Sequence, residues 1–156
     1  LAILARNKPG GLELVCYTAP MKDCIFCKIV RGKLPSYKVY EDEKTLAFLD
    51  MYPVTPGHAL VVPKQHSTNI FDIAPDDWSV TCETARVVAA MLDKALNADG
   101  VNLMMNNREH AGQVVEHPHI HLIPRFKGDG FTLWPHKSYA EGEAATIAEK
   151  IRNVSH

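Results

Sequence analysis

The segment His117-Pro118-His119-Ile120-His121-Leu122-Ile123 carries three histidines at alternate positions. Because successive side chains of a β-strand point to opposite faces, the three imidazoles would share one face at intervals of about 7 Å. Imidazoles spaced in this way can hold a metal ion or a phosphate group, although a solvent-exposed polar face would show the same pattern. We expect a strand over residues 114–123, with Pro118 at a sheet edge or at a local break.

A short polar loop precedes the three histidines. The small residues of Ala111-Gly112-Gln113 allow backbone N–H groups to approach an anion closely. The side-chain amides of Asn106 and Gln113 can add further donors. An Ala-Gly-Gln tripeptide is by itself typical of an ordinary turn, but its position directly before the histidines favours an anion-binding loop.

The remaining pattern predicts four further strands and two helices. Short apolar stretches predict strands at residues 37–41, 45–50, 58–63 and 101–105. Residues 76–97 predict a long amphipathic helix, ended by Gly100, with an apolar stripe at Trp78, Cys82, Ala85, Ala89, Leu92 and Leu96. Ser138 and Glu141 suggest a capping box for a final helix whose apolar side comprises Ala144, Ile147, Ile151 and Val154. The expected fold class is α+β: a mainly antiparallel sheet of about five strands with one long helix and a C-terminal helix.

Composition limits the classes of protein and partner. The chain has 156 residues, of which 46% are apolar and 22% charged, so one folded domain with its own core is expected. The net charge of -1 favours neither a nucleic acid nor an anionic membrane as a partner, and no apolar run is long enough to span a bilayer. We interpret residues 1–20 as an N-terminal extension or an artificial addition, and residues 21–156 as the domain.

The four cysteines do not require a disulfide framework in a chain of this size, so a reducing cytoplasm is expected. Cys24-x-x-Cys27 is a zinc half-site, a redox pair or two buried thiols. The redox interpretation needs a βαβ context that the pattern lacks. A structural zinc site needs two more ligands, for which His66 and His117 are the candidates.

Taken together, these motifs resemble the signature of the histidine-triad (HIT) superfamily of nucleotide hydrolases and transferases. The defining matches are Asn106, Ala111-Gly112-Gln113 and His117-x-His119-x-His121. Other matching segments are Cys24 to Ile29, Ala47 to Asp50, and Pro56 to Lys64 with His66. The likeness extends from Asp23 to Phe126, and the later Gly128-Asp129-Gly130 and Trp134-Pro135 look like the bacterial branch.

The resemblance implies cleavage at the α-phosphate of a purine nucleotide derivative, either a nucleoside phosphoramidate or a dinucleoside polyphosphate. His119 would attack the phosphorus, and water would hydrolyse the resulting nucleotidyl-histidine. The other ring nitrogen of His119 would donate to the His117 carbonyl. His121, Gln113 and Asn106 would hold the phosphate oxygens without a catalytic metal. The implied nucleotide contacts are Ile25, Phe26, Phe48, Asp50, Asn106, Gly112, Gln113, Val114, His119 and His121.

The resemblance also implies a homodimer and a structural zinc ion on Cys24, Cys27, His66 and His117. Val114 stands where many members carry a polar side chain, so only its backbone amide could contact phosphate. The remaining histidines His58, His136 and His156 are interpreted as ordinary surface or loop residues, and His110 has no assigned role.

Two rival functions would use the same residues. In the first, His117, His119 and His121 bind a catalytic zinc ion that activates water. In the second, the protein is a nucleotide-binding regulator with incidental turnover.

Overall fold

The computed structural model describes residues 3–8, 11–16, 24–132 and 134–154 of the chain. A two-stranded hairpin, β1 (Ile3–Lys8) and β2 (Gly11–Cys16), precedes the main domain. The domain contains α1 (Ile25–Val30), β3 (Lys38–Glu41), β4 (Thr45–Leu49), β5 (Ala59–Pro63), α2 (Pro75–Leu96), β6 (Gly100–Met104), a short 3-10 helix η1 (Glu109–Ala111) and β7 (Ile120–Arg125). A last helix, α3 (Glu143–Arg152), follows.

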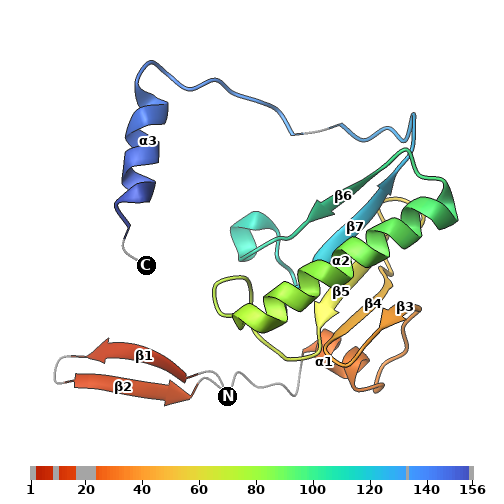
Figure 1. Cartoon of the computed structure of the whole chain (residues 1–156), viewed down its shortest axis with the longest axis horizontal. Coiled ribbons are helices and arrows are strands. Elements are labelled where there is room, and N and C mark those ends of the chain that lie inside the picture. The colour runs from red at the N-terminus through yellow and green to blue at the C-terminus, as the bar shows by residue number, and fades with distance from the viewer. Residues whose placement is uncertain (1–2, 9–10, 17–23, 133, 155–156) are drawn as a thin grey trace.

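The domain is built on one antiparallel sheet with the strand order β3-β4-β5-β7-β6 (Figure 1). This architecture confirms the expected α+β class with five strands and one long helix. The long helix lies within one residue of its predicted bounds at each end. Pro75 occupies its first turn, where a missing N–H costs nothing, and Asp76 and Asp77 complement the positive end of the helix dipole.

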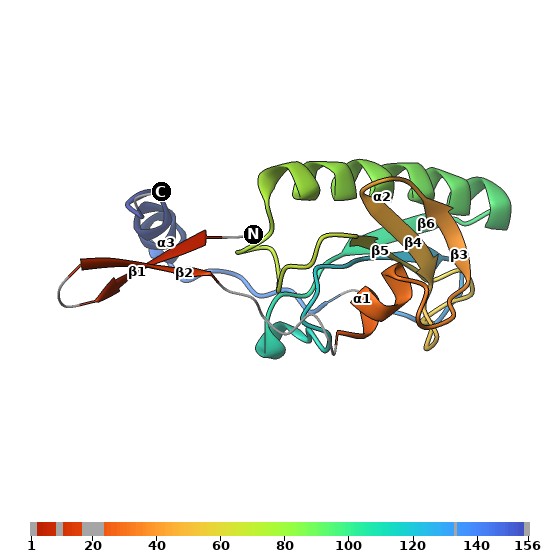
Figure 2. The same ribbon diagram turned by 90° about the horizontal axis from the view of Figure 1, so that it is seen from below.

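The two faces of the sheet are covered by different helices (Figure 2). On one face, Ala85, Val88 and Leu92 of α2 pack against Ala47, Ala59, Val61, Ile120 and Leu122. On the other face, Phe26 and Ile29 of α1 pack against Leu46, Phe48, Leu60 and Val62. Strands β4 and β5 therefore have apolar side chains in both directions, as expected for strands buried on both faces.

Strand β7 begins at Ile120, six residues later than predicted. Pro118 cannot donate to a strand ladder, so residues 117–119 lie outside the strand, and the local break is the correct alternative. The strand itself is central, between β5 and β6, and is not at an edge. Because Ile120 and Leu122 face α2, His121 between them faces the side of the sheet that α1 covers.

The C-terminal part departs from the prediction. Helix α3 begins five residues after Ser138, and Glu143 closes the preceding turn by accepting the Ala140 N–H at 2.7 Å, so the capping box is wrong. The predicted apolar side of α3 is not packed onto the sheet: Ile151 and Val154 are exposed, and the helix lies away from the domain (Figure 1). The predicted domain start at Met21 lies outside the described residues.

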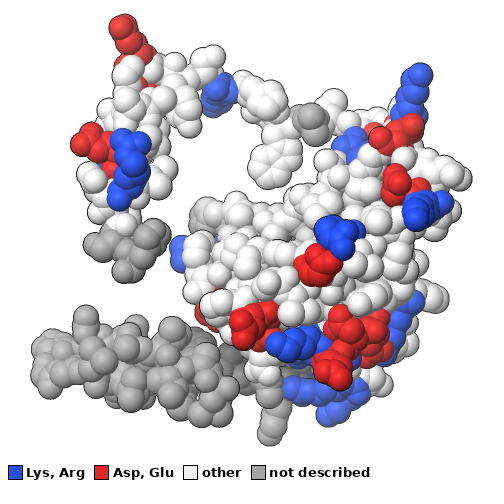
Figure 3. Space-filling view, viewed as in Figure 1, with Lys and Arg blue, Asp and Glu red and all other residues white. Residues whose placement is uncertain are grey.

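Two surface properties follow from the same description. Acidic and basic side chains are interspersed on the face of the molecule shown in Figure 3, as the net charge of -1 suggests. Among the described residues, no helix is long and apolar enough to cross a membrane.

Candidate functional site

His119 is held in one orientation by a backbone bond directly before β7. Its Nδ1 donates to the carbonyl oxygen of His117 at 2.7 Å, as the sequence analysis predicts. The proton is thereby fixed on Nδ1, and Nε2 keeps its lone pair. The side chain is only 6% exposed, and this burial lowers the pKa of His119, so the imidazole is neutral near pH 7.

His121 is oriented by a histidine that the sequence analysis dismissed. The backbone N–H of Val54 donates to His58 Nδ1 at 3.2 Å, so the proton of the neutral His58 ring is on Nε2. His58 Nε2 lies 3.0 Å from His121 Nδ1 and donates to it. The proton of His121 is consequently on Nε2, the atom that can donate to a ligand. Burial, together with the charges of His119 and His58, lowers the pKa of His121 to about 4.

His58 is therefore a buried member of the site, and its interpretation as a surface residue is wrong. It is 3% exposed, and burial lowers its pKa. It directly precedes β5, whose Leu60 pairs with His121, so period-two alternation places His58 on the same face as Leu60. This alternation was the sequence signal that could have identified His58 as a member of the site. The histidine was missed because its partner lies on a strand 63 residues away.

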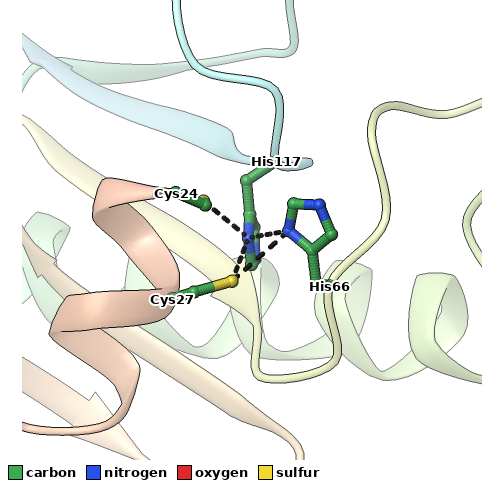
Figure 4. Close-up of side chains that lie close together, drawn as sticks. All are labelled: Cys24, Cys27, His66 and His117. Carbon is green, nitrogen blue, oxygen red and sulfur yellow. Dashed lines mark hydrogen bonds between the residues drawn. The ribbon is translucent and has the colours of Figure 1, made fainter. Parts of the chain in front are cut away.

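Four sulfur and nitrogen atoms converge beside the histidines (Figure 4). Cys24 Sγ lies 3.5 Å from His117 Nδ1, and Cys27 Sγ lies 3.6 Å from the same atom. His66 Nδ1 lies 3.3 Å from Cys27 Sγ and 3.2 Å from His117 Nδ1. All four ligand atoms are within 4.8 Å of one another. The structure thus brings together the four residues proposed to bind zinc.

The separations match a tetrahedral zinc centre. Zn–S bonds of about 2.3 Å and Zn–N bonds of about 2.05 Å place sulfur and nitrogen about 3.6 Å apart and two nitrogens about 3.3 Å apart. His117 is also in the required tautomer, because its Nε2 donates to the carbonyl of Pro63 at 2.8 Å and leaves Nδ1 unprotonated. Burial lowers the pKa of His117 to about 4, so its ring is neutral. The donor set therefore fits zinc.

Helix α1, which the sequence analysis did not predict, positions the two cysteines. Cys24 directly precedes the helix, and its carbonyl accepts the Lys28 N–H, so that Cys24 and Cys27 lie one turn apart on the same side. Ile25 and Phe26 lie between the two cysteines. The Phe26 ring has edge contacts with Phe48 and His119, at centroid separations of 5.6 and 5.1 Å. One turn of helix thus carries both cysteines of the candidate zinc site and two of the predicted nucleotide contacts.

The three histidine rings do not converge on one point. His117 Nδ1 faces the cysteines, whereas His119 Nδ1 is bonded to a backbone carbonyl. Asp50, His58 and His121 form a second group that is close enough to hold an ion. Three of its imidazole nitrogens already have hydrogen-bond partners, however: His58 Nδ1 accepts the Val54 N–H, and His58 Nε2 donates to His121 Nδ1. The described residues therefore do not support a zinc ion shared by His117, His119 and His121.

The loop between β6 and β7 is held by the Gln113 side chain. Its Nε2 donates to the carbonyls of Thr68 and Val115, at 2.7 and 2.9 Å, and its Oε1 accepts the Arg108 N–H at 2.7 Å. Both amide protons are thus used within the protein, and a direct bond from Gln113 to phosphate, as predicted, does not fit this arrangement. Gln113 instead positions the loop. Asn106 Nδ2 donates to the Gly112 carbonyl at 3.3 Å, which leaves its Oδ1 and one N–H available.

A cavity of about 740 Å³ opens between α1, the loop after β5 and the β6–β7 loop. Ile25, Gln113 and Val114, three of the predicted nucleotide contacts, line it together with His66 and Arg108. Val114 is 92% exposed, so this residue of the cavity lining is open to solvent. Phe48 is buried and packs against Phe26. The Oδ2 atom of Asp50 lies 3.7 Å from His58 Nδ1.

A model of the HIT domain matches residues 31–128, which is most of the chain. The chain belongs to the HIT family. Protein hit of Bacillus subtilis is 42% identical over 136 residues, covering 86% of this chain and 90% of the relative. The HIT fold is also seen in the crystal structure of SMU.412c from Streptococcus mutans, which matches with a TM-score of 0.81 and 42% identity over 92% of this chain and 90% of that chain.

Other HIT relatives bear on the chemistry and the metal. A zinc-bound histidine triad protein from Mycobacterium smegmatis matches with a TM-score of 0.68 and 34% identity, over 83% of this chain and 96% of that chain. An adenylylsulfatase of Arabidopsis thaliana is 40% identical over 74% of this chain and 58% of its own length. An adenosine 5'-monophosphoramidase of Candida albicans is 35% identical over 83% of this chain and 89% of its own length. Nucleotide hydrolysis is therefore an activity of this family.

Proposed function

We propose that this HIT protein is a nucleotide hydrolase or nucleotidyl transferase that cleaves at the α-phosphate of a purine nucleotide derivative through a covalent intermediate on His119. The observation that carries the proposal is the 2.7 Å bond from His119 Nδ1 to the His117 carbonyl. This bond leaves an unprotonated, buried Nε2 that can act as a nucleophile. The names of the adenylylsulfatase and the monophosphoramidase relatives agree with cleavage at an adenylyl phosphate.

In the first step, the lone pair of His119 Nε2 forms a bond to the α-phosphorus while the bond to the leaving group breaks. Water then attacks the same phosphorus, and the bond to His119 breaks in turn. The Nε2–H of His121 donates a hydrogen bond to a phosphate oxygen as negative charge develops on it. Asn106 and the backbone amide of Val114 hold the other oxygens, and Gly112, whose N–H donates to the Glu109 carbonyl at 2.8 Å, allows the phosphate to approach the loop closely. Asp50 accepts from the ribose hydroxyls, and Ile25, Phe26 and Phe48 contact the base.

A bound zinc ion would supply structural cross-linking in this scheme and would not act on the substrate. Cys24, Cys27, His66 and His117 would hold it. These four residues hold α1, which carries Ile25 and Phe26, against His117, and the carbonyl of His117 orients His119. We propose a homodimer in the cytoplasm as the biological unit, which sedimentation analysis of the purified protein would test.

Direct detection of the intermediate tests the covalent step. Mixing the enzyme with adenosine 5'-phosphoramidate and quenching within milliseconds should give a protein mass increased by one adenylyl group, located by peptide mapping on His119. The adduct should be absent from the His119→Ala variant. Rapid turnover without an adduct at any quench time would contradict the covalent mechanism.

The pH profile provides a second test. Since burial lowers the pKa of His119, the imidazole keeps its lone pair at pH values where an ordinary histidine, with a pKa of about 6.5, is half protonated. We expect kcat/KM to be constant from pH 8 down to about 6.5 and to fall only at lower pH. Measuring kcat/KM from pH 4.5 to 8.5 checks this. A half-maximal rate at or above pH 6.5 would contradict a neutral buried nucleophile.

His58 should act on turnover through His121. His58→Ala removes the donor to His121 Nδ1, so the proton of His121 is no longer confined to Nε2, and we expect kcat/KM to fall about 10- to 100-fold. His58→Gln offers an amide N–H in place of the imidazole and should recover part of the loss. His136→Ala, which changes an exposed histidine, is the matched control. If the fall in kcat/KM parallels the fall in Tm in both the Ala and the Gln variant, His58 has only a structural role.

A further inference from the structure

Arg108 has a backbone conformation that glycine adopts readily and other residues rarely do. Its φ of 72° and ψ of 162° lie in a region that is almost exclusive to glycine. The only other non-glycine residue with positive φ in the described chain is Asn97, at 50°, whose left-handed conformation is common for asparagine at a helix C-terminus. Arg108 is therefore the one position where the described backbone is strained without such an explanation.

The surrounding structure maintains this conformation with several bonds. The Arg108 N–H donates to Gln113 Oε1 at 2.7 Å, and the Arg108 carbonyl accepts the N–H groups of Ala111 and Gln113 at 3.1 Å each. The guanidinium lies over the ring of Phe71, 4.3 Å from its centroid. Phe71 belongs to the loop after β5, which is also bonded to the β6–β7 loop through Asn107 and Ile70. Two loops thus cooperate to fix the Arg108 side chain beside the cavity.

The guanidinium has no ion-pair partner among the residues that the structure describes, although its face is stacked on Phe71. Of the residues that line the cavity, Arg108 is the only one with a permanent positive charge, while Glu109 and Glu116 are exposed carboxylates in the same lining. Ile25, Gln113 and Val114 line the same cavity. A nucleotide bound there would bring its phosphates towards a planar donor that matches phosphate oxygens in geometry.

We propose that Arg108 is a specificity-determining residue that binds a phosphate group of the substrate beyond the one attacked by His119. This inference rests on the proposed nucleotide-hydrolase function and predicts that, among its substrates, the protein prefers nucleotides with two or more phosphates, such as dinucleoside polyphosphates. Stacking on Phe71 fixes the guanidinium before the ligand arrives, so that less side-chain freedom is lost on binding. The two carboxylates disfavour anions that the guanidinium does not contact.

Equilibrium binding separates this proposal from catalysis. Isothermal titration of the wild-type protein with AMP and with ADP should show tighter binding of ADP. Arg108→Ala should reduce the ADP-to-AMP affinity ratio about tenfold, and Arg108→Lys should reduce it less, because the ammonium keeps the charge but not the planar fork. The control is Arg86→Ala on α2, which removes the same charge from an exposed site paired with Glu83. It should leave the ratio unchanged.

Thermal unfolding checks the strain independently. Arg108→Gly and Arg108→Ala both lack the guanidinium, but only glycine relaxes the backbone, so Tm of the Gly variant should exceed that of the Ala variant by a few degrees. Both variants should lose the preference for ADP.

The outcomes distinguish the two proposals. If the wild-type protein binds neither AMP nor ADP, the nucleotide function itself fails. If both bind equally to the wild-type protein, or if Arg108→Ala keeps the ADP preference, the role of Arg108 is overturned and the nucleotide function stands.

Discussion

Replacing His119 with alanine is expected to lower kcat/KM for adenosine 5'-phosphoramidate by a factor on the order of 10⁴ or more. In the proposed mechanism the imidazole supplies the atom that bonds to phosphorus, and neither His121 nor the loop amides can replace a nucleophile. Steady-state kinetics with a sensitive assay for released AMP measures the loss. Nucleotide binding and zinc content should persist, because His119 is not one of the four residues Cys24, Cys27, His66 and His117, and it bonds to the backbone carbonyl of His117 and not to its ring.

His110→Ala is the matched control for this experiment. His110 is an exposed histidine in η1, directly before the Gly112-Gln113 loop, and has no partner among the described side-chain contacts. Its replacement should leave kcat/KM within about twofold of the wild-type value. Residual activity of His119→Ala within tenfold of the wild type would contradict the proposed mechanism. Joint loss of metal and activity would favour the rival in which the triad binds a catalytic zinc ion.

Removing the metal is expected to lower Tm by an amount on the order of 10 °C. Structural zinc contributes directly to folding, and its loss leaves the ligand atoms of Cys27 and His117, which are 2% and 0% exposed, with only sulfur–nitrogen and nitrogen–nitrogen contacts in place of metal bonds. Burial and the neighbouring Cys24 raise the pKa of Cys27 to about 11, so without a cation this thiol stays protonated at neutral pH. Elemental analysis should find one zinc per chain, and scanning calorimetry before and after chelation gives the change in Tm.

Two cysteine variants separate the metal from ordinary packing. Cys27→Ser should lose zinc and show most of the fall in Tm, whereas Cys82→Ala, on α2 and distant from the cluster in sequence and fold, should keep zinc. Activity of Cys27→Ser should fall as well, because the His117 carbonyl that orients His119 is no longer fixed. A protein purified under reducing conditions without zinc, and with unchanged Tm in Cys27→Ser, would contradict the structural role.

Local periodicity predicted most of the sheet and the long helix. The apolar stripe of residues 76–97 repeats over many turns, and short continuous apolar stretches predicted β4 and β5. The prediction was less accurate at chain breaks. Asn97 ends α2 in a left-handed conformation, whereas Gly100, expected to end it, begins β6. Helix α1 has only six residues, too few for a periodic signal, so sequence spacing revealed its cysteines but not their helix.

The candidate site divides in the same way. His117, His119, His121, Cys24 and Cys27 were found because they recur at short, regular spacings, whereas His66 was proposed as a further zinc ligand with the support of the family resemblance. His58 and the bonds of Gln113 were not found, since they depend on contacts between strands and loops far apart in the chain. The apolar side of α3 was predicted from its spacing, but spacing cannot say what a helix packs against, and in the structure it does not pack on the sheet.

His117 makes three contacts in three directions. Its ring Nδ1 contacts Cys27 Sγ, its ring Nε2 donates to the Pro63 carbonyl, and its own carbonyl accepts from His119 Nδ1. Structural zinc sites are built from cysteine and histidine in different proportions. At this position a thiolate could complete a metal site, but it has no second donor for Pro63, and its shorter side chain would draw the backbone towards the metal. Position 117 therefore requires a histidine, whereas no described bond joins the backbones of Cys24, Cys27 and His66 to His119, so cysteine and histidine can replace one another there without moving it.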